Sequence, residues 1–389
     1  MSLLLPHILS FADAETKIKC LSLSSRMLKT LASCKGVWQY IEWSNSSRIT
    51  KTLHRLCSRA GPDAKRITLN LNCTMKDLYT LFSRNNCKPK NLVLDHSVIR
   101  LISRSDSNTQ KLFSFIGSSI ETFSWSFGWN AGMMRRIIPL LSNLKKLTLE
   151  GGDSIAFSVT QIMTSLQELL MRRSVSSTVT WKGSNLLTKC PNLKILDLSG
   201  HHFNSSITLY KAFKSFKSLK KLNLSDTTFT DASYIGDSLL LLMEKRTLTD
   251  LNVSGMKDLT EFDLKCIALA SESLLNLNCS KLLPSALALS KNRITSLTLS
   301  ECHFKEQEWI RILNAFQMVQ MLDLSNNFIT DKVIEKISEM SELRELNISN
   351  CSHLTGGGRL LKINEYCDIN VSGCNNMRLD ILSCLSNRK

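Results

Sequence analysis

Residues 343–355 read Leu-Arg-Glu-Leu-Asn-Ile-Ser-Asn-Cys-Ser-His-Leu-Thr, and this pattern decides the fold. The apolar residues Leu343, Leu346 and Ile348 are separated first by two variable residues and then by one. Because polar residues alternate with Leu346 and Ile348, the segment is predicted to form a short strand with one buried face. A single strand of this kind cannot bury its apolar side alone, so the pattern requires neighbours of the same type.

The same frame recurs along most of the 389-residue chain. The last apolar residue of each predicted strand marks one copy, and these markers are Leu71, Leu94, Trp125, Leu149, Met171, Leu198, Leu224, Val253, Cys279, Leu299, Leu324, Ile348 and Val371. The 13 copies are 20 to 31 residues apart and 25 on average. The chain therefore resembles the leucine-rich-repeat proteins, which have this frame and repeat length.

Each copy continues into a helix in the second half of the chain. Apolar residues recur on one helical face over residues 207–219 and 331–343, and a last helix is expected at 379–385. Strands stack about 4.8 Å apart and helices about 8–10 Å apart, so the strands must line the inside of a curve. The predicted fold class is α/β, a leucine-rich-repeat solenoid with a curved parallel sheet inside and helices outside. It covers residues 65–389 with about 13 repeats, after a connecting helix in residues 44–64.

Composition excludes several classes of protein. Hydrophobic residues make up 43% of the chain, which is enough for a continuous core and too many for a disordered segment. No apolar run approaches the roughly 18 residues that cross a bilayer, so no membrane partner is expected. The 13 cysteines form no closely paired cap at either end of the array. They are expected to be reduced and buried, as in a cytoplasmic or nuclear protein.

The positive charge of the chain is distributed unevenly. The formal net charge is +16, of which residues 1–180 carry +13 and residues 181–389 carry +3. A basic first half is consistent with nucleic acid, lipid headgroups or an acidic protein as a partner. It is equally consistent with a contribution to solubility alone.

Residues 1–43 do not carry the repeat. They begin with Leu5 and Pro6, continue with Phe11, place Arg26 fifteen residues after it, and end near Trp38. Apolar residues between positions 18 and 31 recur at three- and four-residue steps, which predicts helix. This order of residues resembles an F-box, and residues 49–71 resemble the segment that leads into the repeats of F-box leucine-rich-repeat proteins.

The resemblance implies that residues 1–43 form a helical module that docks on the Skp-type adaptor of a cullin ubiquitin ligase. The repeats would then hold a protein substrate for transfer of ubiquitin. The residues assigned by resemblance to the adaptor contact are Leu5, Pro6, Ile8, Leu9, Leu21, Leu23, Leu28, Leu31 and Trp38. Two alternatives stay open. Residues 1–43 could be a helical cap on a leucine-rich-repeat scaffold with no ligase role, or the basic solenoid could bind nucleic acid or phosphates.

A substrate surface is expected on the exposed side of the predicted strands. Asp or Asn and then Ser recur there in columns, although such residues more often complete turns than bind a partner. The first half of the array adds basic and aromatic residues. The candidate substrate-binding residues are Trp129, Lys146, Arg172, Arg173, Trp181, Asn223 and Asn252.

The sequence contains no pattern that indicates catalysis. The seven histidines are scattered, and no Cys-x-x-Cys pair is present to indicate a zinc site. The glycines at 356–358 lack the Lys-Ser or Lys-Thr of a phosphate-binding loop. The chain is therefore expected to be a non-enzymatic adaptor without cofactor or metal.

Overall fold

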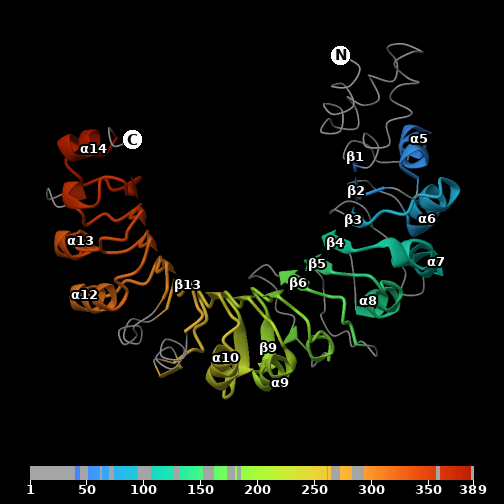
Figure 1. The fold of residues 1–389 in the computed structure, drawn as a ribbon, viewed down its shortest axis with the longest axis horizontal. Helices are drawn as coiled ribbons and strands as arrows, with labels where there is room; N and C mark the ends of the chain where they lie inside the picture. The colour runs from blue at the N-terminus through green and yellow to red at the C-terminus, as the bar shows by residue number, and fades with distance from the viewer. Residues whose placement is uncertain are drawn as a thin grey trace, which may run out of the picture. The chain divides into compact units, whose positions relative to one another are not determined.

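The structure is a computed structural model, and it divides the chain into an N-terminal unit, Met1–Leu193, and a C-terminal unit, Lys194–Lys389. It describes residues 40–43, 51–61, 64–69, 74–94, 107–126, 131–151, 162–172, 180–181, 185–260, 262–263, 272–282, 293–355 and 360–386. Residues 1–39 lie outside the described residues, and with them all nine of the predicted adaptor contacts. Figure 1 shows the elements of both units.

The described part of the N-terminal unit contains a parallel sheet of six strands. These are β1 (Tyr40–Trp43), β2 (Arg66–Leu69), β3 (Asn91–Leu94), β4 (Thr122–Ser126), β5 (Lys146–Glu150) and β6 (Glu168–Arg172). The connecting helices are α5 (Lys51–Ala60), α6 (Met75–Arg84), α7 (Ser107–Ile116) and α8 (Ala131–Ile137), with short turns η2 (Gly117–Ser119), η3 (Ile138–Leu140) and η4 (Leu187–Lys189). A two-residue strand, β7, covers Thr180–Trp181.

Local chemistry explains where these elements start and which side they bury. Helix α6 begins with a capping box, in which the Asp77 N–H donates to the Thr74 hydroxyl and the Thr74 N–H donates to the Asp77 carboxylate. The sheet buries alternate residues, so that Phe123 and Trp125 of β4 lie in the core at 0% and 1% exposure. Phe123 packs edge-on against both Phe113 of α7 and Trp125.

The described part of the C-terminal unit contains a second run of parallel strands, eight in number. They are β8 (Ile195–Asp197), β10 (Lys221–Asn223), β12 (Asp250–Asn252), β13 (Asn276–Asn278), β14 (Ser296–Thr298), β15 (Met321–Asp323), β16 (Glu345–Asn347) and β17 (Asp368–Asn370). The strands β9 (His202–Ser205) and β11 (Thr228–Asp231) also pair in parallel. The helices are α9 (Ile207–Ser215), α10 (Ile235–Glu244), α12 (Glu306–Ala315), α13 (Asp331–Ile337) and α14 (Leu379–Ser386), with a short turn at η6 (Leu360–Lys362).

The buried leucines of this unit stand in register from strand to strand. Leu297, Leu322 and Leu346 are partners in β14, β15 and β16, and each is at most 2% exposed. The ladder continues one residue past the strands, because the Leu324 N–H donates to the Asn347 carbonyl at 2.8 Å. Leu324 itself is fully buried. Strand, turn and helix therefore repeat as units that bury one continuous apolar layer, and the fold is that of leucine-rich repeats.

The structure confirms most of the predicted register and shifts its start. Twelve of the 13 predicted markers lie in a strand or directly after one. The exception is Leu71, which lies outside the described residues; the residue of β2 that pairs with Leu94 is Leu69. The sheet also begins earlier, because β1 occupies the last four residues of the stretch 1–43. Helix α5 lies within the predicted connector 44–64.

The three helices predicted in the second half of the chain are present, two of them shorter than predicted. Helix α9 ends at Ser215, and α13 ends at Ile337 before a turn leads to β16. Thr330 stands at the N-cap of α13, but its hydroxyl donates to the Glu306 carboxylate at 2.6 Å and does not cap the helix. Among the described helices, none combines the length and the apolar character that crossing a bilayer requires.

Candidate binding surface on the C-terminal repeats

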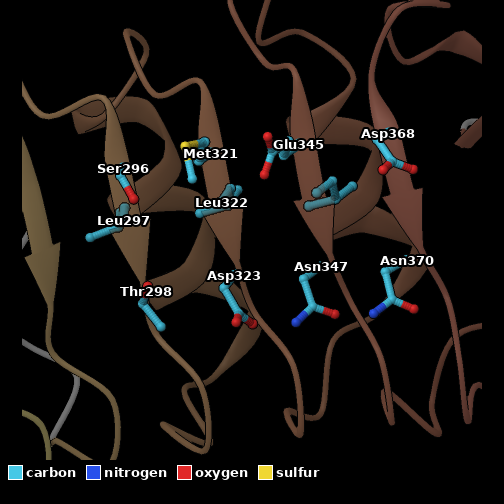
Figure 2. A pocket seen from close by; sticks show the side chains of 11 residues that line it. Ser296, Leu297, Thr298, Met321, Leu322, Asp323, Glu345, Asn347, Asp368 and Asn370 are labelled. Carbon is cyan, nitrogen blue, oxygen red and sulfur yellow. The ribbon is translucent and has the colours of Figure 1, made fainter. Parts of the chain in front are cut away.

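The exposed side of strands β14 to β17 forms a shallow groove of about 330 Å³. Strand alternation directs two residues of each strand to this side, as Figure 2 shows. We call this surface the β14–β17 face, and its residues are Ser296, Thr298, Met321, Asp323, Glu345, Asn347, Asp368 and Asn370. Met321 is 46% exposed there, which gives the groove an apolar contact beside its polar ones.

The β14–β17 face is acidic. Three of its eight residues are carboxylates, namely Asp323, Glu345 and Asp368, and none is basic. Glu345 and Asp368 are register partners on adjacent strands, and both are exposed. Neither has an ion-pair partner within the described part of the chain. Two like charges held side by side repel one another, and a positively charged group bound between them would relieve the repulsion.

The column of Asp and Asn residues has a local structural role. In seven repeats its side-chain oxygen accepts a hydrogen bond of 2.9–3.2 Å from the N–H two residues later. The residues that accept in this way are Asp197, Asn223, Asn252, Asn278, Asp323, Asn347 and Asn370. Each therefore fixes the turn that follows its strand. A role of Asn223 and Asn252 in substrate binding stays a prediction.

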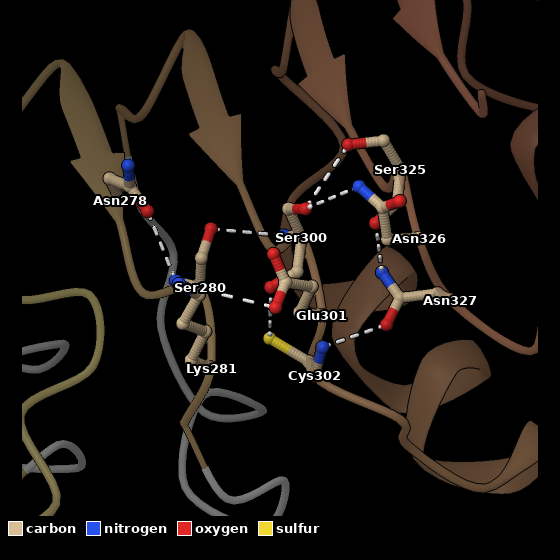
Figure 3. A network of polar contacts seen from close by, with 9 residues as sticks. All are labelled: Asn278, Ser280, Lys281, Ser300, Glu301, Cys302, Ser325, Asn326 and Asn327. Carbon is tan, nitrogen blue, oxygen red and sulfur yellow. Dashed lines mark hydrogen bonds and ion pairs between the residues drawn. The ribbon is translucent and has the colours of Figure 1, made fainter. Parts of the chain in front are cut away.

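The repeat that contains β14 has no Asp or Asn at this position, and the preceding repeat supplies the missing hydrogen-bond acceptor. Thr298 occupies the position in β14 and has no carbonyl oxygen to offer. The N–H of Ser300 donates instead to the hydroxyl of Ser280 in the preceding repeat, at 3.0 Å. Figure 3 shows this bond next to the turn that Asn278 completes for Ser280.

A buried asparagine connects the turn after β14 with the turn after β15 through hydrogen bonds. Asn327 is 2% exposed, and its side-chain oxygen accepts from the N–H groups of Cys302 and His303 at 2.8 and 2.9 Å. Its side-chain nitrogen donates to the carbonyls of Leu299 and Leu324 at 2.7 and 2.9 Å. Figure 3 shows Asn327 reaching toward the turn at Cys302. This network fixes the position of the residues that follow each turn.

Three aromatic rings stand directly beyond these turns. His303 and Phe328 each lie four residues after the buried residue that follows their strand, Leu299 or Leu324, and His353 lies five residues after Ile348. Their ring centroids are 5.0 Å apart at both contacts, and all three side chains are exposed. Phe328 is 55% exposed. We call these three residues the ring row. The period of the repeat relates His303 to Phe328, whereas His353 lies one residue past the equivalent position.

The basic candidates in the N-terminal unit are paired with carboxylates. Lys146 of β5 lies 2.6 Å from the Glu168 carboxylate of β6, and Arg172 lies 4.0 Å from that of Glu150. Their pairing reduces the positive charge that they can offer to a partner. Trp129 and Arg173 lie outside the described residues, and Trp181 belongs to β7 but its side chain is not described. The role of all five in binding stays a prediction.

A second group of lysines is neutralised in the same way. Glu121, before β4, lies 2.8 Å from Lys145 and 3.3 Å from Lys90. The hydrogen bonds from Lys145 and then Lys90 lower the pKa of the Glu121 carboxyl. The described strand ends of the N-terminal unit therefore carry mixed and paired charges, whereas the β14–β17 face carries charge of one sign.

The cysteines next to the β14–β17 face are unreactive core residues. Burial raises the pKa of Cys302 and of Cys351 to about 11 each. Their thiols are protonated at neutral pH and are poor nucleophiles. Within the described ranges, no group of three or more His, Cys, Asp or Glu residues is placed to hold a metal ion.

Comparisons with known proteins identify fold neighbours only. No family model matches the chain, and no curated protein matches it. Among solved structures, the chain is similar to the internalin inlF from Listeria monocytogenes, with 15% identity, a TM-score of 0.44, and coverage of 87% of this chain and 82% of that one. It is also similar to TLR13 in a complex with ssRNA13, with 17% identity, a TM-score of 0.46 and coverage of 93% of this chain. The match spans about half, 54%, of the TLR13 chain.

Proposed function

We propose that the chain is a non-enzymatic, substrate-recognition adaptor of an SCF-type cullin ubiquitin ligase. The observation that carries the binding role is the β14–β17 face, an exposed groove of one charge sign on a rigid array of buried repeats. The ligase role is supported by the F-box-like order of Leu5, Pro6, Phe11, Arg26 and Trp38 ahead of that array. The chain would contribute to catalysis only by positioning a substrate for its ligase partner.

The proposal divides the chain into two contacts. Residues 1–43 would dock on a Skp-type adaptor through the apolar residues that the F-box resemblance assigns, and the repeats would bind a protein substrate. The proposed place of action is the cytoplasm or nucleus. Because a protein contact of standard size buries about 800 Å² per partner, the substrate would extend beyond the groove itself.

One substitution tests the ligase role. Leu5→Asp should abolish co-purification with a Skp-type adaptor, because docking would bury an unpaired charge. The melting temperature should stay nearly unchanged, since an F-box keeps such a residue for its partner. If the wild-type chain captures no Skp-type adaptor, the ligase role fails and only the binding role of the repeats is left.

A plain interaction scaffold is the second candidate, and β1 favours it. Residues 40–43 form β1 and pair with β2, so the end of the stretch 1–43 belongs to the array itself, as part of a cap would. If residues 1–43 are a cap, Leu5→Asp should lower the melting temperature, because it would place a charge in the cap's contact with the first repeat. The same pair of measurements therefore separates the two candidates.

Binding of nucleic acid or phosphates through the basic first half is the remaining alternative. The ion pairs of Lys146, Lys145 and Lys90 weigh against it, because paired lysines offer less charge to phosphates. Such binding would weaken steeply as the salt concentration rises. A titration of single-stranded and double-stranded oligonucleotides at two salt concentrations tests it.

A further inference from the structure

The C-terminal repeats differ in charge from the rest of the chain. Residues 296–386 contain 8 Lys or Arg and 12 Asp or Glu, which gives a net charge of −4. The remainder of the chain carries +20. An acidic stretch in a strongly basic protein is not required for solubility, since the chain as a whole is already far from neutral. It is therefore best explained by what this stretch contacts.

Two acidic residues of the sheet lie on adjacent strands. Glu345 and Asp368 are register partners, so their carboxylates project from adjacent strands, which lie about 4.8 Å apart. Figure 2 shows both on the side of the sheet that carries the groove, with the Glu345 carboxylate on the side of its strand that faces Met321. A planar guanidinium with its fork of N–H donors fits two neighbouring carboxylates better than a single point charge does.

The ring row supplies a second contact for a guanidinium at the C-terminal edge of the same strands. Phe328 is more than half exposed, the His303 ring lies tilted against it at 33°, and the His353 ring meets it edge-on. Asn327 fixes the turn at His303 through the N–H of that residue. A large exposed ring that is already held in place loses little conformational entropy on binding. Arginine stacks on such rings through cation–π contact.

We propose that the β14–β17 face and the ring row together bind an extended, arginine-containing basic segment of a partner protein. One arginine pairs with Glu345 and Asp368, and another stacks on Phe328. The inference rests on the binding role proposed above and names the class of partner. Crossing four strands takes about 14 Å, which an extended segment covers with roughly five residues.

The probe is a fluorescent peptide of alternating arginine and serine, titrated into the full chain by anisotropy. Glu345→Gln/Asp368→Asn should weaken its binding about tenfold, since two exposed charge contacts are lost. The matched control is Glu342→Gln/Glu365→Gln, which removes the same charge from exposed turns of the same two repeats and should leave binding unchanged.

The stacking contact is tested separately. Phe328→Ala should weaken peptide binding about threefold, whereas Met318→Ala, at 58% exposure on the turn before β15, should have no effect. Replacing each arginine of the peptide by lysine keeps the charge and should weaken binding to the wild type. In the Phe328→Ala variant, replacing arginine by lysine in the peptide should weaken binding less than it does in the wild type.

Two results would overturn the inference: the wild type does not bind the peptide, or the face and control double variants bind it equally. The proposed function is judged by a different variant, Ser296→Trp, which obstructs the groove without changing charge. If Ser296→Trp abolishes capture of cellular partners while Glu345→Gln/Asp368→Asn leaves it intact, the binding role stands and the basic segment is excluded. If neither variant affects capture, both the binding role of the face and the basic segment as its partner are excluded.

Discussion

Asn327 and Cys302 are 25 residues apart in the chain and are joined by a 2.8 Å hydrogen bond from the Cys302 N–H to the Asn327 side-chain oxygen. The same oxygen accepts from His303, and the side-chain nitrogen donates to carbonyls of two repeats. One buried side chain thus connects the turn after β14 with the turn after β15, and it fixes the base of the ring row.

Replacing this side chain should be costly. Asn327→Ala would leave the N–H groups of Cys302 and His303 and the carbonyl of Leu299 without their partner, and should lower the free energy of unfolding by about 2–4 kcal/mol. Chemical denaturation measures the loss. Asn314→Ala, on the exposed side of α12, is the matched control and should change stability little. Equal stabilities of the two variants would mean that water replaces the Asn327 contacts.

The leucines that mark the repeat should each carry a large share of stability. Leu324→Ala or Leu346→Ala would open a cavity at a position of 0% or 1% exposure, and should cost about 2–5 kcal/mol. Urea denaturation of the two variants tests this expectation. Met318→Ala, at an exposed position of the same region, should cost far less. A loss below about 1 kcal/mol at Leu324 would contradict the inward orientation of that column.

The bond from Ser300 to Ser280 predicts a rescue. Ser280→Ala should destabilise the chain by about 1–2 kcal/mol, because the Ser300 N–H loses its acceptor. Ser254→Ala should cost less, since Asn278 already serves the N–H of Ser280 in that repeat. Adding Thr298→Asn to Ser280→Ala should restore most of the loss by supplying the missing side-chain oxygen. A double-mutant cycle without coupling would contradict this compensation.

The sequence predicted the repeat well because period-two alternation and a regular spacing follow directly from burial of one strand face. It placed Leu324 and Leu346 in the core and identified the turn-forming role of the Asp and Asn column as the more frequent one. It misplaced the first marker, Leu71, because Leu69 and Leu71 are both apolar and both fit the alternation. The pairing with Leu94 decides between them.

The candidate site was less predictable from the sequence. The sequence directed attention to Lys146 and Arg172 because it shows their charge and not their partners, which stand on neighbouring strands some twenty residues away. Glu345 and Asp368 are 23 residues apart in the sequence, and only the strand register shows that they are partners on adjacent strands. The ring row lies beyond the strands, in turns where alternation carries no information.

The buried thiols predict a loss of stability at high pH. Burial raises the pKa of Cys302 and Cys351 from 9.0 to about 11 in the folded chain. Between about pH 9 and pH 11 the unfolded chain therefore binds fewer protons at these thiols, and the free energy of unfolding falls as the pH rises. The slope should be shallower for Cys302→Ala/Cys351→Ala in urea denaturation across this range.

The exposed thiol of Cys384 provides the control for that measurement. Cys384→Ala also removes a cysteine, but from an exposed position, so it controls for the loss of a cysteine outside the core. An unchanged slope in the Cys302→Ala/Cys351→Ala variant would show that other groups cause the loss.

Site-specific photo-crosslinking shows whether a partner protein binds at the β14–β17 face, with benzoylphenylalanine placed at Met321 on the face or at Gln307 on the exposed side of α12. We expect the full chain to crosslink a partner protein from Met321 and not from Gln307, and Ser296→Trp to abolish the product. Crosslinking from Gln307 alone, or a product from Met321 that survives Ser296→Trp, would contradict binding at this face.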